Sequence, residues 1–325
     1  MRLKRCFVWL MWTVFLVDTA SPQPQVLNAF RLSSERSDSG TISEVEFSTG
    51  LVELESGTLA HHVPHAMKNL RFAERVWVIG YRTEILDANG KTPRENYLCH
   101  TFLADRRVAQ HEEEDLSGIY SDAFTPVVRL PDGFGIPITP DETLHWMPMF
   151  NNREAASVRV QMRVVVTVIR EKDRTKPIKP LHSSLRSVQV PHLFFVPPGR
   201  DQRQVTFALP FRGRIHFLGT HIHPYGVSIE LYNTSRNEQV WKSVRKVQPD
   251  GPMDVYSSTV GYPVKAGETF RIVAVYHNPT QDKIDAWPGS LYCTCRIDIV
   301  SVNLLTPGRI RSIKDHRVVR ILHVG

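Results

Sequence analysis

The sequence ASVRVQMRVVVTVI, residues 156–169, carries the clearest structural signal in this chain, and VWVIGYRTEI at residues 76–85 repeats it. Both are rich in Val, Ile, Thr and aromatic residues and contain patches in which apolar and polar side chains alternate, as in β-strands. Similar stretches, separated by turn residues, occur at residues 204–209, 226–232, 269–276 and 291–300. Long helical periodicity is absent. We therefore predict an all-β protein built from two tandem antiparallel β-sandwiches, with the jelly roll as the leading version.

The chain is long enough for two compact units. It has 325 residues, 42% of them hydrophobic and 22% charged, a composition typical of globular proteins whose domains hold about 100–200 residues. A charged segment with two prolines, EKDRTKPIKP, starts at Glu171 and interrupts the strand pattern. We predict an N-terminal sandwich over residues 26–170, a linker over residues 171–187 and a C-terminal sandwich over residues 188–305.

The N-terminus has the features of an export signal. Within residues 1–20, Arg2, Lys4 and Arg5 precede an apolar run from Cys6 to Val17. That run is shorter than the roughly 20 apolar residues that a membrane-spanning helix needs. We therefore predict a signal peptide over residues 1–20, a secreted or periplasmic location for the mature protein, and no integral membrane span.

The positive charge of the chain gathers at its C-terminus. The formal net charge is +7, and the tail over residues 306–325 carries five Arg or Lys residues against one Asp. A nucleic-acid-binding domain usually shows a basic face interleaved with aromatic residues, and this single terminal stretch does not fit that pattern. We predict no nucleic-acid partner, and a basic tail that faces solvent or an acidic surface.

The strongest local motif is GTHIHPYG, residues 219–226. On an extended strand, His221 and His223 project from the same face about 7 Å apart, where two imidazoles can bind one metal ion. Ile215 and Phe217 share this parity, so without a bulge the pair continues a core-facing row to the inner rim of the C-terminal sandwich. The alternative is that ordinary hydrogen bonds satisfy both histidines. Burying polar side chains at core positions costs free energy unless they are bonded, and this favours a metal ion as their shared partner.

The residues around this motif resemble a known family. FFVPPGRDQ at residues 194–202 and FALPFRGRIHFLGTHIHPYG at residues 207–226 resemble the second domain of the copper- and ascorbate-dependent monooxygenases, the peptidylglycine alpha-hydroxylating and dopamine beta-monooxygenase family. VYHNPT at residues 275–280, with Asp285 and Ala286, is similar to bacterial and plant nodulin-type relatives. The resemblance implies two jelly-roll domains that each hold one copper across a solvent-filled cleft, with ascorbate as the reductant.

By this resemblance, His221 and His223 are ligands of the oxygen-activating copper in the second domain. The family completes that site with a methionine from a later strand. Here Trp287 or Pro288 holds the position, and neither supplies a thioether. Three other residues remain as alternative third ligands: His277, Cys293 and Cys295.

The resemblance also implies an electron-relay copper in the first domain, held in the family by a His-His pair and a later histidine. The corresponding stretch YLCHTFLAD supplies Cys99 and His100, and the later strand LHWMPMFNN has Met149 where the histidine is expected. A Cys, His and Met set favours soft Cu(I) and would not reproduce the family's chemistry. The alternative is that Cys99 and Met149 only pack in the core.

Two functions are compatible with these residues. One is an exported copper-monooxygenase-like enzyme with altered ligands that acts on a small-molecule or peptide substrate. The other is a non-catalytic binding or structural protein on the same scaffold. Because three of the six ligand positions of the family are changed, we predict an exported copper-monooxygenase-like protein that binds one metal ion through the HxH pair, and both the enzyme and the non-catalytic protein stay open as alternatives.

Overall fold

The computed structural model describes residues 23–58, 61–105, 118–123, 125–188, 196–209, 211–222, 225–247, 251–282 and 296–302. In these ranges the chain forms 22 β-strands and one short 3-10 turn, η1 (Pro64–Ala66), so the prediction of an all-β protein is confirmed. The described residues contain no helix that has the length and apolar character needed to cross a membrane. The predicted signal peptide and the predicted basic tail lie outside the described residues.

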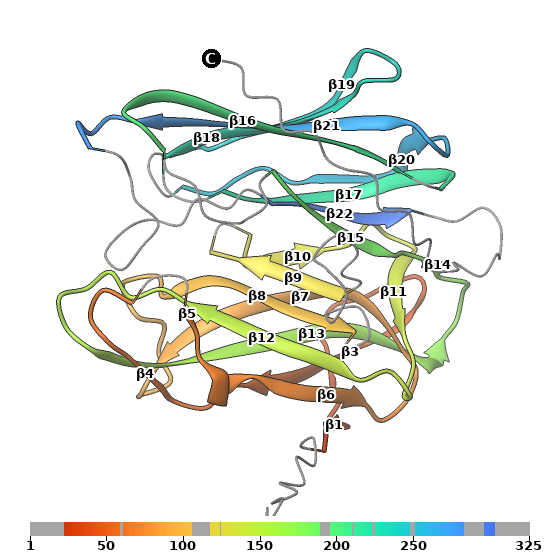
Figure 1. The fold of residues 1–325 in the computed structure, drawn as a ribbon. Helices are drawn as coiled ribbons and strands as arrows, with labels where there is room; N and C mark the ends of the chain where they lie inside the picture. Colours follow the sequence, from red (N-terminus) through yellow and green to blue (C-terminus); the bar gives the residue numbers. More distant parts are fainter. Residues whose placement is uncertain are drawn as a thin grey trace, which may run out of the picture.

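Two sheets form the N-terminal part of the molecule (Figure 1). The six-stranded sheet contains β1 (Gln25–Leu27), β5 (His61–His62), β6 (Lys68–Phe72), β8 (Leu98–Asp105), β9 (Gly118–Asp122) and β12 (Leu144–Phe150). Its order is β1-β6-β12-β8-β9, with β5 beside β12. The eight-stranded sheet contains β2 (Arg31–Leu32), β3 (Gly40–Ser48), β4 (Val52–Leu54), β7 (Val76–Asp87), β10 (Val127–Arg129), β11 (Phe134–Ile138), β13 (Val158–Arg174) and β14 (Lys179–Pro180). Its order is β14-β11-β7-β13-β3-β2, with β10 beside β7 and β4 beside β13.

Two four-stranded sheets form the C-terminal part. The β17 sheet contains β15 (Ser183–Ser187), β17 (Gly213–His221), β20 (Tyr256–Val264) and β22 (Arg296–Val302), in the order β15-β22-β17-β20. The β18 sheet contains β16 (Gly199–Ala208), β18 (Gly226–Asn233), β19 (Glu238–Val244) and β21 (Thr269–Asn278), in the order β16-β21-β18-β19. Figure 1 shows the β17 sheet between the β18 sheet and the N-terminal sheets.

Alternation along β12 explains how the N-terminal core forms. Leu144, Trp146 and Phe150 are buried in that core, while Met147 and Met149 occupy the alternate, half-buried positions of the strand. The Trp146 ring packs edge-on against Phe47 of β3 at a centroid distance of 4.7 Å. The buried indole N–H of Trp146 donates a hydrogen bond to Thr101 Oγ1 at 2.7 Å. Apolar burial therefore joins the two N-terminal sheets, and the other face of β12 remains for a different contact.

A second core joins the β17 sheet to the β18 sheet. Ile215 and Leu218 of β17 are fully buried against Leu231 of β18 and Ile272 of β21. Fully burying a side chain of this size contributes about 1.5–3 kcal/mol. Each pair of sheets thus has its own core.

The segment predicted as a linker, residues 171–187, takes part in sheets on both sides. Strand β13 continues to Arg174, and the backbone N–H groups of Lys179 and Leu181 donate to the carbonyls of Gly133 and Gly135 at 2.9 and 2.8 Å. Strand β15 already pairs with β22 from Ser183 onward. These backbone hydrogen bonds leave only residues 181 and 182 between the last strand of the first unit and the first strand of the second.

Candidate metal centre

Three ligand-type side chains meet where β8 faces β17. Cys99 and His100 lie on β8, and His221 is the last residue of β17. One donor atom from each residue lies within 4.8 Å of the other two. Their exposed fractions are 6%, 3% and 2%, so the group is closed to bulk water. A buried cluster of one thiol and two imidazoles could hold a metal ion, since both side chains are common ligands of transition metals.

A β-bulge brings the two adjacent donors of β8 to the same side. His100 is paired with Met149 of β12, and the next pair along is Leu98 with Phe150, so Cys99 is the extra residue. Bulges commonly re-aim a side chain in this way beside functional sites. Cys99 Sγ lies 3.3 Å from His100 Nδ1. Two donors bound at about 2.0–2.3 Å to one tetrahedral ion lie roughly 3.5 Å apart, so this pair already has the spacing of two ligands.

His221 points toward the N-terminal sheets, which differs from the expected inner rim of the C-terminal sandwich. Ile215 and Leu218 belong to the C-terminal core, whereas Phe217 packs in the N-terminal core. The alternation therefore breaks between Ile215 and Phe217, at the point where the register of β17 with β20 shifts. The prediction that Ile215, Phe217 and His221 lie in one row on a core face is therefore wrong. Alternate residues share a face only along an uninterrupted strand.

The Asp122 carboxylate lies beside the imidazole of His221. Asp122 is the last residue of β9, directly opposite His100 in the β8–β9 register. Its Oδ2 lies 3.4 Å from His221 Nδ1, and its Oδ1 accepts a hydrogen bond from the backbone N–H of Thr125 at 2.7 Å. Since a carboxylate favours a proton on the nearer ring nitrogen, the lone pair of Nε2 would be left for a metal ion, the arrangement common to metal-bound histidines. Asp122 does not stand out in the sequence, because only the β8–β9 register relates it to His100.

Aromatic rings surround the donors. The His100 and His221 rings are 5.1 Å apart at an interplanar angle of 69°. The Phe102 ring lies 5.2 Å from His100, and the Tyr120 ring lies 5.9 Å from His100 and 6.2 Å from His221. An apolar shell of this kind excludes water and strengthens electrostatic interactions inside it.

The other predicted ligands are placed differently. Met149 is the cross-strand neighbour of His100 and is half-buried. His277 is exposed on β21 of the β18 sheet, where its backbone N–H donates to the Tyr225 carbonyl at 2.8 Å, and it is not part of the cluster. His223 lies outside the described residues. The resemblance implied two separate sites, yet the structure brings Cys99 and His100 of the first together with His221 of the second.

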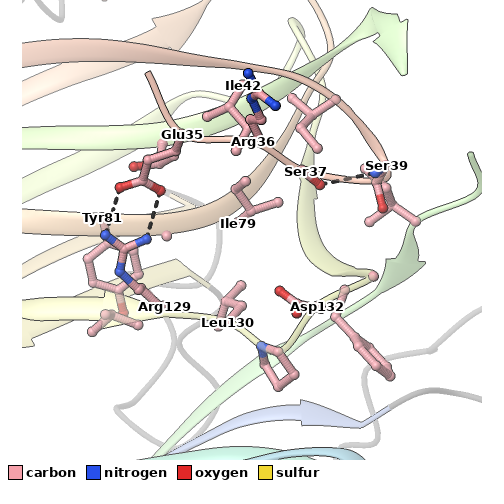
Figure 2. Close-up of a pocket in the computed structure, with 18 of the residues that line it drawn as sticks. Glu35, Arg36, Ser37, Ser39, Ile42, Ile79, Tyr81, Arg129, Leu130 and Asp132 are labelled. Carbon is pink, nitrogen blue, oxygen red and sulfur yellow. Dashed lines mark hydrogen bonds and ion pairs between the residues drawn. The ribbon is translucent and has the colours of Figure 1, made fainter. Parts of the chain in front are cut away.

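A separate cavity of about 140 Å³ lies against the eight-stranded sheet (Figure 2). None of the three donors lines it. Figure 2 shows the Glu35 carboxylate facing the Arg129 guanidinium, which donates two hydrogen bonds to it at 2.6 and 2.7 Å. These hydrogen bonds hold the pKa of Glu35 below its usual value. The paired charges of Glu35 and Arg129 form part of the cavity lining, and we assign the cavity no ligand.

Comparisons with known proteins give no family for this chain. No family model and no curated protein matches it. Among solved structures, the chain is similar to procruciferin, an 11S globulin from Brassica napus, at 10% sequence identity and a TM-score of 0.16, over 88% of this chain and 87% of that chain. A TM-score this low supports no inference about fold or function, so the functional argument rests on the residues of the cluster.

Proposed function

We propose that this protein is an exported, copper-monooxygenase-like protein that binds one copper ion between two tandem jelly-roll sandwiches. One observation carries the proposal. Cys99 and His100 from one pair of sheets and His221 from the other bring three buried donor atoms within 4.8 Å of one another. Donor atoms that meet from the two sides of an interface can bind one ion, which then joins the two sides.

The donor set favours copper. Thiolate and imidazole donors suit copper and zinc, whereas magnesium, calcium and manganese prefer oxygen ligands. The cluster contains no carboxylate among the described residues, and Asp122 beside it faces Nδ1 of His221, the nitrogen that would point away from the ion. The resemblance to copper enzymes then favours copper over zinc.

The arrangement supports metal binding more than two-copper hydroxylation. The resemblance assigns Cys99 and His100 to one copper and His221 to another across a cleft, and hydroxylation by that route needs both. Here all three donors contribute to one group with exposed fractions of 2–6%. A site that activates oxygen needs a coordination position open to its substrates. We therefore favour the non-catalytic alternative over the enzyme.

Each side chain has a defined task at the proposed site. Cys99 releases its thiol proton to become the thiolate donor. His100 offers Nδ1, the nitrogen next to Cys99 Sγ, and His221 offers Nε2 while Asp122 holds the Nδ1 proton. A bound ion would link β8 to β17, so that binding the metal and docking the two sandwiches stabilise each other.

Metal analysis of the exported chain tests the proposal. We expect about one copper per chain after copper loading, a loss of most of it in His221→Ala, and full occupancy in His277→Ala, which removes an exposed histidine outside the cluster. Unchanged copper in His221→Ala, or a loss confined to His277→Ala, would overturn the site. Ascorbate-dependent oxygen consumption separates the two functions: we expect none, and copper-dependent uptake would favour the enzyme.

A further inference from the structure

Three residues on neighbouring strands form a row across the six-stranded sheet. His100 of β8 is directly opposite Met149 of β12 on one side and Asp122 of β9 on the other. Residues directly opposite each other in an antiparallel sheet share a face, with Cβ atoms about 4.5–5.5 Å apart. Asp122 reaches His221 of β17, so this face is the one that meets the C-terminal sheets. Met149 therefore belongs to the same face as the metal cluster.

Of the groups in this row, Met149 is the one suited to complete the site. Asp122 is engaged by the Thr125 N–H and by His221 Nδ1. Met149 is half-buried, and its thioether is a soft donor of the kind that accompanies thiolate and imidazole around copper. Met147, two residues earlier on the same face, instead packs with Phe102 and Tyr120. The two methionines thus have separate surroundings on one strand.

We propose that Met149 is the fourth donor, so that Cys99, His100, His221 and Met149 form a Cys-His₂-Met ligand set. This inference rests on the proposed copper site and specifies its chemistry. Two imidazoles and a thiolate with a weak methionine donor make the ligand set of the copper proteins that exchange single electrons. Burial of the donors and the rings of Phe102 and Tyr120 suit such a site, because the surroundings of the sulfur tune its reduction potential. The candidate step is a one-electron reduction, in which a small reductant such as ascorbate loses one electron and Cu(II) gains it to become Cu(I).

Spectroscopy of the full chain loaded with Cu(II) tests the thiolate donor. We expect the intense visible charge-transfer band of a copper–thiolate bond, and its loss in Cys99→Ser. Copper bound in a His221-dependent manner without this band would overturn the inference and leave the proposed function standing. Absence of His221-dependent copper would overturn the proposed function itself, and this inference with it.

The midpoint potential tests Met149. We expect Met149→Leu, which nearly conserves side-chain volume, to keep one copper per chain and to raise the potential, because Cu(II) loses a donor. Met149→Gln supplies an oxygen donor and is expected to lower the potential. Met147→Leu is the matched control, on the same face of the same strand; because Met147 packs with Phe102 and Tyr120 and is no proposed donor, this variant should shift the potential less than either Met149 variant. Shifts of the same sign in both Met149 variants, or a potential in Met149→Leu equal to that of Met147→Leu, would refute the assignment.

Discussion

Replacing Asp122 by Asn should weaken copper binding about tenfold without disturbing the fold. The Asn side chain keeps the oxygen that accepts the Thr125 N–H bond at 2.7 Å, but it removes the negative charge 3.4 Å from His221 Nδ1. With a copper ion bound, this charge would keep the proton on Nδ1 and so favour binding of the metal through Nε2. The ligand His221 is therefore intact in the variant, but it is a poorer donor.

The size of the effect follows from the contact. A hydrogen bond to a charged group contributes about 1.5–3 kcal/mol. The Asp122–His221 contact is an ion pair at 3.4 Å without hydrogen-bond geometry, so we take the lower limit of this range as the largest expected loss. A loss of about 1.4 kcal/mol is a tenfold increase in Kd. That value lies at the lower end of the 10–100-fold losses typical when a partner of a ligand is removed.

Competition between the protein and a coloured copper chelator measures this Kd. The matched control is Asp132→Asn, which makes the same charge change at an exposed position outside the cluster. We expect the control to bind copper as the natural chain does. If Asp122→Asn bound copper within twofold of Asp132→Asn, then Asp122 would not orient His221, and the choice of Nε2 as the donor would lose its support.

Three further results are expected. Gly261→Ala should lower the unfolding free energy in urea by roughly 2–5 kcal/mol, because Gly261 has a φ of +71° and a Cβ there would lie 2.8 Å from the His216 ring. The control is Gly57→Ala, at the same φ but in open space, which should lower the unfolding free energy by only about 1–2 kcal/mol. Equal losses in the two variants would contradict the contact with His216. Copper at about 100 times its Kd should add about 2.7 kcal/mol to the unfolding free energy, and a gain that persisted in His221→Ala would place the ion elsewhere. Burial lowers the pKa of His216 below 6.5, so the unfolded state takes up a proton that the folded state does not, and stability present above about pH 6.5 falls as the pH decreases further. His216→Gln should flatten this dependence in urea titrations at about pH 7.5 and about pH 5.5, and an unchanged slope would assign it to other groups.

The strand content could be predicted from local sequence, because alternation and β-branched residues act within a single strand. The stretch at residues 158–174 forms β13, which pairs with β7 and β3 as a central strand of its sheet. The end of the first unit was less predictable. Backbone hydrogen bonds draw Lys179 into the eight-stranded sheet, and such bonds leave no mark in the side-chain pattern of a charged, proline-bearing segment.

The candidate site was predictable by residue type but not by arrangement. His221, His100 and Cys99 all stand out as ligand-type residues in strand patterns, and the structure brings them together. Their grouping depends on one extra residue at Cys99 and on the break between Ile215 and Phe217. A change of one residue in register turns every following side chain to the other face, so a parity argument cannot foresee a bulge.

The three donors are synthesised at different times, because the chain is made from its N-terminus. Cys99 and His100 leave the ribosome well before His221, and a nascent chain with only this pair offers two of the three donors. A truncated or misassembled chain would expose the Cys99 sulfhydryl to oxidants and to other thiols, whereas in the folded molecule Cys99 is 6% exposed. Placing β17 beside β8 therefore completes the donor group around a Cys99 thiol that is buried in the folded chain.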